Sequence, residues 1–208
     1  MISIVSSTND LTLRTAGLGA ICGYELQATV CNVALRGCCS TFLEYVATCI
    51  KDGYVIQAND TFQYGYWVTK LIPDENNDLI FWELKPDATD FVLGVSSTLT
   101  YWQNQYNVCL KSAAKFDPIT PDQMIAISDG VYEGDAVEGV RYPAPAHMSG
   151  WYLTTNRYDG DISSLKVVHA YHVSERRPDL AKFFALPCGY RFQTVDNDVW
   201  FDKTTLTS

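Results

Sequence analysis

Basic residues are scarce in this chain of 208 residues. It has 15 Lys and Arg against 24 Asp and Glu, which gives a net charge of −9, and no run of basic residues interrupts the sequence. General binding to nucleic acid phosphates depends on clustered Lys and Arg that release counterions, so we do not expect it here. An acidic chain is better matched to a basic partner protein.

The sequence also lacks a long apolar run. Charged or polar residues interrupt every apolar stretch before it approaches the ~20 residues that a membrane-spanning helix needs. The first basic residue is Arg14, so the opening residues do not have the pattern of a secretory signal. These features predict a cytoplasmic protein without membrane contact.

Motifs of catalysis and metal binding are missing as well. We find no nucleophile elbow, no phosphate-binding loop and no dinucleotide fingerprint. The seven Cys residues show no paired zinc spacing and no regular disulfide series, which predicts reduced and mostly buried thiols. The three histidines are His147, His169 and His172, and a strand through the last two would point them to opposite faces. We therefore expect no metal and no cofactor.

Apolar and aromatic residues, in contrast, are abundant. They make up 47% and 13% of the chain, enough to form a core that offsets the entropy of folding. The length corresponds to about one and a half typical domains. Two prolines, Pro118 and Pro121, break any helix or central strand near the middle. We therefore expect an α+β protein with mixed or antiparallel sheets and a few flanking helices, in two contiguous lobes at residues 1–115 and 116–208.

The spacing of apolar residues predicts the elements of each lobe, with period two for strands and three to four for helices. In the first lobe we expect strands at 24–35, 61–72 and 79–84, and helices from Ser40 to Gly53 and over 96–114. In the second lobe we expect strands at 124–127, 151–155 and 165–173. A short helix from Ser174 through Pro178 to Leu186 follows, although Pro178 could instead reset its start with Arg177 before it. A hairpin of 190–194 with 199–201 completes the lobe.

Residues 116–140 contain six acidic residues and no Lys or Arg. Four of them, Asp129, Glu133, Asp135 and Glu138, lie near glycines, as in a solvated loop. The same residues could form a surface that steers a basic partner. A third interpretation is acid–base catalysis by these carboxylates, which would need environments that push the pKa values of the acid and the base apart.

Several tracts of the second half resemble a known family. They are residues 148–158, Gly160-Asp161, residues 169–173, residues 177–182 and residues 186–192. Together they resemble the C-terminal domain of a family of bacterial immunity proteins from polymorphic-toxin and type VI secretion loci. The resemblance covers residues 117–200 and contains no catalytic motif.

The resemblance implies a protein that is not an enzyme. Such a protein binds a cognate toxin, for example a type VI nuclease effector, and blocks its active site or its assembly. An acidic inhibitor can occupy a groove built for phosphates. Because Trp, Tyr and Arg dominate binding hot spots, we expect the toxin to contact Trp151, Tyr152, Arg157 and Tyr158, beside Asp129, Glu133, Asp135 and Glu138.

Several alternatives stay open at this point. Strand parity could place Trp151 in the core with Leu153, leaving Tyr152 outward. A small hydrolase or transferase could use carboxylates near Gly134 and a histidine, and a ligand-binding scaffold would need a preformed apolar pocket. The sequence does not decide between a monomer and a homodimer.

Overall fold

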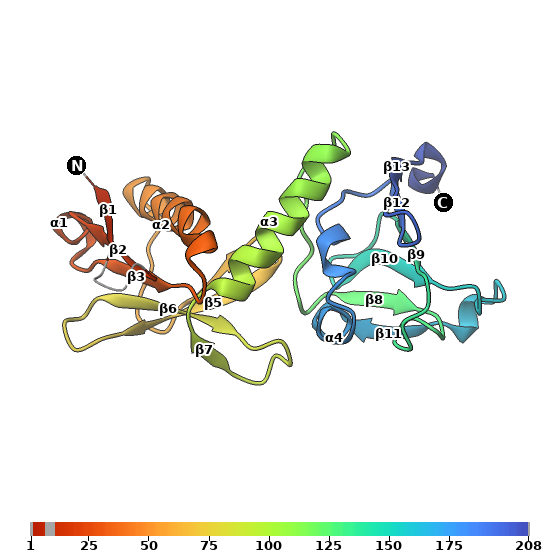
Figure 1. Ribbon diagram of the computed structural model, residues 1–208, viewed down its shortest axis with the longest axis horizontal. Helices are drawn as coiled ribbons and strands as arrows, with labels where there is room; N and C mark the ends of the chain where they lie inside the picture. The colour runs from red at the N-terminus through yellow and green to blue at the C-terminus, as the bar shows by residue number, and fades with distance from the viewer. Residues whose placement is uncertain (1, 7–10, 208) are drawn as a thin grey trace. The chain divides into compact units, whose positions relative to one another are not determined.

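The computed structural model describes residues 2–6 and 11–207 and divides into two compact units, Met1–Gln103 and Asn104–Ser208. Each unit combines one mixed β-sheet with helices (Figure 1), so the predicted α+β class with two lobes is confirmed. The boundary between the units falls inside helix α3 (Ser96–Lys111), ahead of the tract that contains Pro118 and Pro121.

The N-terminal unit is built on a seven-stranded sheet in the order β1-β2-β3-β6-β5-β4, with β7 paired to β6. Neighbouring strands are antiparallel except β3 and β6, which are parallel. The strands are β1 (Ser3–Ser6), β2 (Thr12–Ala16), β3 (Leu26–Thr29), β4 (Thr61–Tyr64), β5 (Trp67–Pro73), β6 (Leu79–Leu84) and β7 (Phe91–Leu93). The helical segments are α1 (Gly19–Cys22), the 3-10 turn Val33–Leu35, α2 (Arg36–Lys51) and the first turns of α3.

The core of the N-terminal unit lies on one face of this sheet. Phe42 of α2 packs edge-on against Phe81 of β6 and Tyr64 of β4, with ring centroids 4.7 and 4.8 Å apart. Leu99 of α3 belongs to the same buried cluster. Figure 1 shows both helices on the same side of the strands.

The helical stretch Val33–Lys51 is long and apolar enough to cross a membrane by length and composition alone. This stretch was not predicted from the sequence as a possible membrane span, because charged or polar residues interrupt its apolar residues. In the structure its apolar face, with Phe42, Leu43, Val46 and Ile50, is buried against the sheet. The core helix of a water-exposed domain passes the same test, and here the apolar face packs on the sheet of its own unit.

The C-terminal unit is built on a six-stranded sheet in the order β11-β8-β10-β9-β12-β13, in which β8 and β10 are parallel and the other neighbours antiparallel. The strands are β8 (Met124–Ile127), β9 (Glu138–Arg141), β10 (Met148–Thr154), β11 (Lys166–His169), β12 (Tyr190–Gln193) and β13 (Val199–Phe201). Helix α4 (Ala170–Arg176) and the 3-10 turns Ile162–Ser164, Ala181–Phe183 and Lys203–Leu206 complete the unit.

Three predicted elements of the first lobe differ in detail from the structure. The strand predicted over 24–35 forms only as β3 at Leu26–Thr29, and Val33–Leu35 is a 3-10 turn. Helix α2 begins at Arg36, not at Ser40, and the Ser40 hydroxyl donates to Glu44 at 3.0 Å within the helix. Asn32 caps the preceding 3-10 turn through the N–H of Ala34. The strand predicted over 61–72 is interrupted by a turn at Gly65, whose φ of 62° favours glycine.

Two predictions in the second lobe are wrong. The segment 165–173 is not one strand, because β11 ends at His169 and α4 follows at once. The helix predicted from Ser174 to Leu186 does not form, because Pro178 disfavours helical backbone at Arg177 and α4 ends there. A short apolar run such as 167–173 fits a strand or a buried helix equally well.

A buried carboxylate organises the connection between β2 and β3. Glu25 is 9% exposed and accepts a hydrogen bond from the Thr15 hydroxyl at 2.6 Å. It also accepts the main-chain N–H groups of Gly17, Leu18 and Gly19 at 2.9 to 3.2 Å. Burial opposes the charged form, but these hydrogen bonds outweigh it and lower the pKa of Glu25 below its ordinary value of 4.5.

We predict that Glu25→Gln lowers the free energy of unfolding by about 2 kcal/mol at neutral pH, because an amide N–H₂ group then faces main-chain donors. The lowered pKa means that the carboxylate stabilises the fold fully above pH 4.5 and loses this effect as the pH falls through the folded-state pKa. Urea unfolding at several pH values should therefore show a deficit that shrinks on acidification. The control is Glu44→Gln on the exposed side of α2; equal deficits in the two variants would contradict the prediction.

Candidate functional site

One face of the C-terminal sheet presents a row of side chains that crosses all six strands. The strand register places Val167, Ala126, Tyr152, Val140, Arg191 and Trp200 side by side, one from each strand. Trp200 is 38% exposed and Val167 52% exposed, and the Arg191 guanidinium lies 5.8 Å over the Trp200 ring. Tyr, Trp and Arg side chains are the ones that dominate protein-binding hot spots.

The opposite face of the same sheet forms the core. Trp151 and Phe192 are fully buried, with ring centroids 5.3 Å apart, and Phe183 stacks on Phe192 at 3.9 Å. Gly139 is required at this point, because a Cβ atom there would overlap the Phe192 ring. Trp151 therefore packs in the core of the sheet and is not available to a partner, whereas Tyr152 lies on the other face.

A groove of about 630 Å³ lies over β9 and β10 on the face that carries Tyr152. Here we call it the recognition groove, and its aromatic and apolar lining includes Tyr142, Tyr152, Tyr158, Ile162 and Leu165. Tyr142 meets Tyr152 edge-on at 5.3 Å. Gly150 has a φ of 80°, and a Cβ atom there would overlap the Tyr142 carbonyl oxygen, so only glycine permits this wall to approach β10.

Arg141 fixes the wall of the recognition groove from inside. Its side chain is 8% exposed and donates to the carbonyl oxygens of Ser149, Asp117 and Leu186 at 3.0, 2.6 and 2.5 Å. The Asp117 carboxylate lies 3.2 Å away. Burial outweighs the attraction of Asp117 and lowers the pKa of Arg141, yet arginine stays charged because its ordinary pKa is so high.

Arg191 closes one end of the recognition groove with a charged network. It pairs with Asp202 at 2.9 Å and with Glu138, which reaches it from β9. Burial opposes its charge, but the hydrogen bonds to Asp202 and Glu138 prevail and raise the pKa of Arg191. The groove thus joins apolar walls to a fixed guanidinium.

The acidic residues singled out from the sequence do not form a bare negative surface. Asp129 pairs with Lys166 at 2.7 Å, Asp135 with Arg157 at 2.7 Å, and Glu138 with Arg191. The hydrogen bond from Lys166 lowers the pKa of Asp129. Arg177 also donates to the carbonyl oxygens of Val131 and Asp135. Basic residues from later in the chain thus neutralise much of this segment, and Glu133 stays exposed.

The recognition groove brings together only three of the predicted contact residues, Glu138, Tyr152 and Tyr158. Asp135 and Arg157 line a separate hollow of about 440 Å³. Sequence reasoning missed Arg191, Trp200 and Tyr142. The predicted hairpin at 190–201 could have indicated the first two, because Arg191 and Trp200 face each other across it.

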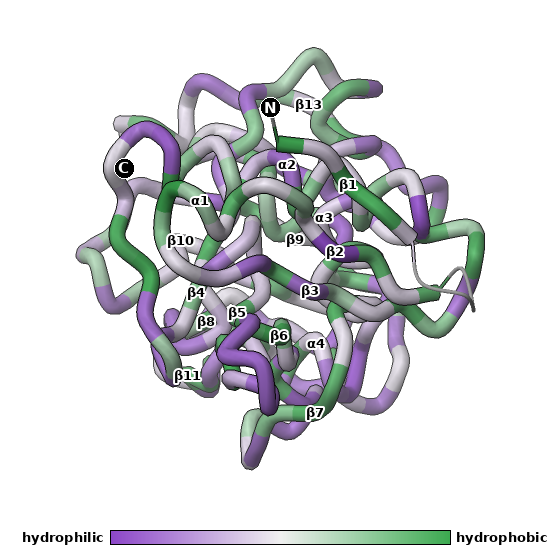
Figure 2. Tube along the Cα trace, turned by 90° about the vertical axis from the view of Figure 1, so that its left-hand side faces the viewer, coloured by the Kyte–Doolittle hydropathy of each residue, from purple (hydrophilic) through white to green (hydrophobic). Residues whose placement is uncertain are grey.

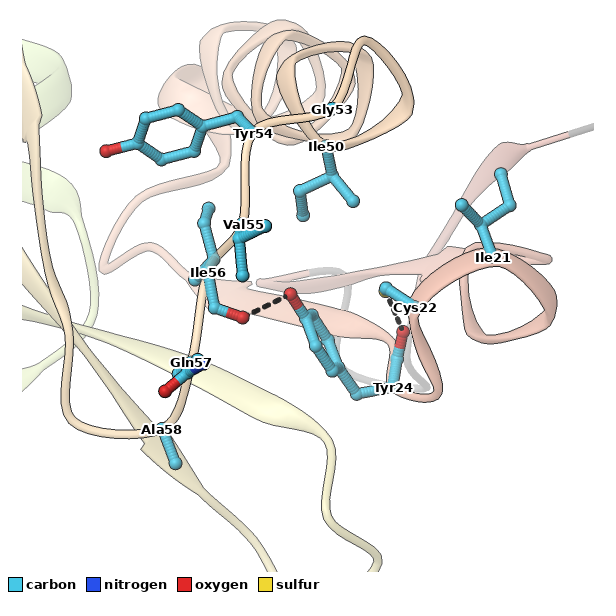
Figure 3. Close-up of a pocket in the computed structure, with 10 residues that line it drawn as sticks. All are labelled: Ile21, Cys22, Tyr24, Ile50, Gly53, Tyr54, Val55, Ile56, Gln57 and Ala58. Carbon is cyan, nitrogen blue, oxygen red and sulfur yellow. Dashed lines mark hydrogen bonds between the residues drawn. The ribbon is translucent and has the colours of Figure 1, made fainter.

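A second hollow, of about 540 Å³, lies in the N-terminal unit between the end of α2 and the turn after α1 (Figure 3). Ile21, Tyr54 and Val55 at its rim are 54%, 55% and 74% exposed. The Tyr24 hydroxyl donates to the Ile56 carbonyl oxygen at 2.7 Å. Burial and the neighbouring Cys22 raise the pKa of Tyr24 to about 12, so it is protonated at neutral pH. The hollow is apolar and holds no acid–base pair.

The histidines and cysteines do not assemble a metal site within residues 2–6 and 11–207, where no group of three or more His, Cys, Asp and Glu side chains could hold an ion. His169 and His172 lie closer than the predicted strand implied, with ring centroids 6.0 Å apart, because α4 begins between them. Cys39 and Cys109 are buried thiols, and burial raises their pKa values to about 12 and about 11.

Comparison with known families bears on this unit alone. Residues 104–202 match the Imm33-like domain. The match begins at the first residue of the C-terminal unit and includes the whole recognition groove and the tracts that resemble immunity proteins. It supports a relation between this part of the chain and an immunity protein family. No curated protein and no solved structure matches the chain.

The buried Arg141 of the Imm33-like region provides a test of the groove. We predict that Arg141→Met lowers the free energy of unfolding by about 3 kcal/mol, since three buried carbonyl groups lose their donor. Chemical denaturation measures this loss, and Lys203→Met at an exposed position is the control. A loss no larger than that of the control would mean that Arg141 does not hold the wall.

Proposed function

We propose that this chain is an immunity protein that binds a cognate toxin and neutralises it by covering its active site or blocking its assembly. The observation that carries the proposal is the Imm33-like match over residues 104–202, which contains an aromatic groove closed by a fixed arginine. Immunity proteins act by binding, and this groove has the residue types that anchor protein interfaces.

The finer proposal is that the toxin is a basic type VI effector, a nuclease that cleaves phosphodiester bonds, and that the chain meets it in the cytoplasm of the producing cell. The net charge of −9 supports a basic partner, because opposite net charges accelerate association. The binding face then includes Tyr152, Tyr158 and Glu138, with Arg191 and Trp200 beside them.

The arrangement of carboxylates favours binding over acid–base catalysis. Asp129, Asp135 and Glu138 form three ion pairs with three different basic residues. Catalytic carboxylates instead need environments that separate their pKa values, such as an apolar pocket for one of them. The immunity relation of residues 104–202 points the same way.

The proposal is tested by expressing the chain together with a basic protein encoded by a neighbouring gene. We expect that protein to be toxic alone, harmless in the presence of this chain, and bound to it in a stoichiometric complex. A neighbouring protein that stays toxic when the chain is present in excess would contradict the proposal.

The binding face is tested separately by replacing one aromatic residue of the groove, Tyr152, and one beside it, Trp200. We predict that Tyr152→Ala and Trp200→Ala each weaken the complex by about 2 kcal/mol, roughly thirtyfold in Kd, because hot-spot aromatics carry much of the binding energy. Calorimetric titration measures the change. Tyr45→Ala, at a 51% exposed tyrosine of the N-terminal unit, is the matched control. Equal affinities for all three variants would place the interface elsewhere.

A further inference from the structure

The N-terminal sheet has a second face, turned away from α2 and α3, whose centre is apolar. The register places Ile72 beside Ile80, and Trp82 beside Leu93. Its apolar residues are Val68, Ile72, Ile80, Trp82, Leu84 and Leu93. Among residues 11–103, the helices that pack on the sheet lie on the opposite side (Figure 1).

Strand β6, at the centre of this face, is apolar on both sides over residues 79–82. Leu79 and Phe81 of β6 point into the core, while Ile80 and Trp82 point to the open face. The neighbouring β7 is hydrophobic along its length (Figure 2), and its Leu93 is 55% exposed. A sheet with one face in water normally alternates apolar and polar residues. A face that departs from this alternation indicates a surface that is covered by another molecule.

Acidic residues stand at both ends of the apolar centre. Asp74 and Glu75 lie in the connection between β5 and β6, at the end marked by Ile72 and Ile80. Asp87 and Asp90 lie in the connection between β6 and β7, at the other end, where Lys85 lies 3.8 Å from Asp90 and forms its ion pair with that residue, not with Asp87. Hydrogen bonds from Thr89 lower the pKa of Asp87, which is therefore charged at neutral pH.

The whole N-terminal unit shares this charge sign. Residues 1–103 contain eleven acidic and five basic residues, whereas residues 104–208 contain thirteen and ten. The net charges are therefore −6 and −3. The open face also carries one basic residue on β5, Lys70, which lies beside Trp82 and 5.8 Å over the Phe91 ring. The electrostatic attraction of a basic protein thus falls mainly on the unit that the Imm33-like match does not cover.

We propose that this open face is a docking surface for a partner protein whose contact region has an apolar centre and Lys or Arg at both ends. The identification of that partner with the toxin rests on the proposed function, but the chemistry of the face does not. A second copy of this chain fits less well, because stacking two such faces brings acidic ends against acidic ends.

The test uses two synthetic strand peptides with the same alternating Val and Leu centre, one with Lys pairs at its ends and one with Glu pairs. Calorimetric titration of the full chain should show that the Lys-ended peptide binds at least about tenfold more tightly, because its ends match the acidic connections. Added salt should reduce this difference.

Three variants locate the binding. Leu93→Lys and the double change Asp74→Asn with Glu75→Gln should each weaken binding of the Lys-ended peptide about fivefold or more. The matched control is Leu110→Lys, at a 67% exposed leucine of α3, and should leave the affinity unchanged. Equal binding of the two peptides, or equal affinities of Leu93→Lys and Leu110→Lys, would overturn the proposal.

Sedimentation of the chain alone completes the test. A dimer that Leu93→Lys dissociates and Leu110→Lys does not would assign the face to a second copy and overturn the proposal. Peptide selectivity as expected, without toxin neutralisation, would support the docking face and refute the immunity function. If the Leu93→Lys variant still neutralised the toxin, and the Lys-ended and Glu-ended peptides bound equally, the docking face would be refuted and the immunity function would stand.

Discussion

The buried guanidinium of Arg141 is the interaction on which the architecture of the C-terminal unit depends. It gathers the carbonyl oxygens of Asp117, Ser149 and Leu186, which belong to three separate segments of chain. Main-chain carbonyl groups buried without a donor are costly, so these segments can meet only where a side chain such as this one supplies several donors. Tyr142, the next residue, then begins the wall of the recognition groove.

Each sheet has one face that forms the core of its own unit and one that its unit covers only in part. In the C-terminal unit, Trp151 and Phe192 point to the covered face, while Tyr152 and Arg191 point away from it. In the N-terminal unit, Phe81 is buried in the core and Trp82 is half-buried on the other face. Because side chains alternate along a strand, neighbouring aromatic residues serve opposite purposes, one folding the unit and the other available for recognition.

The fold class could be predicted from the sequence because period and turn chemistry are local. The hairpin around 73–78 and the helix beginning at Ser96 follow from such signals, and both are present. The strand predicted over 165–173 was wrong because its apolar residues fit a strand or a helix equally well. The end of α4 is set by Pro178, which lies beyond this apolar run. Local patterns do not determine which strands pair. The row of side chains that joins Tyr152, Arg191 and Trp200 could therefore not be predicted from the sequence.

The charge distribution on the surface could not be predicted from the sequence either, because charges that are close in sequence need not lie together in space. The stretch from Asp129 to Glu138 reads as strongly acidic, but Lys166, Arg157 and Arg191 return to it from later strands and loops. Asp74, Glu75 and Asp87 are less dense in the sequence, yet the hairpins of β5, β6 and β7 set them at the ends of one apolar face, where the nearby Asp90 pairs with Lys85. A partner responds to charges that remain unpaired on the surface, because neutralised pairs contribute little to long-range attraction. If the proposed function holds, the N-terminal unit, which lies outside the Imm33-like match, therefore attracts the basic partner, and the groove of the C-terminal unit holds it.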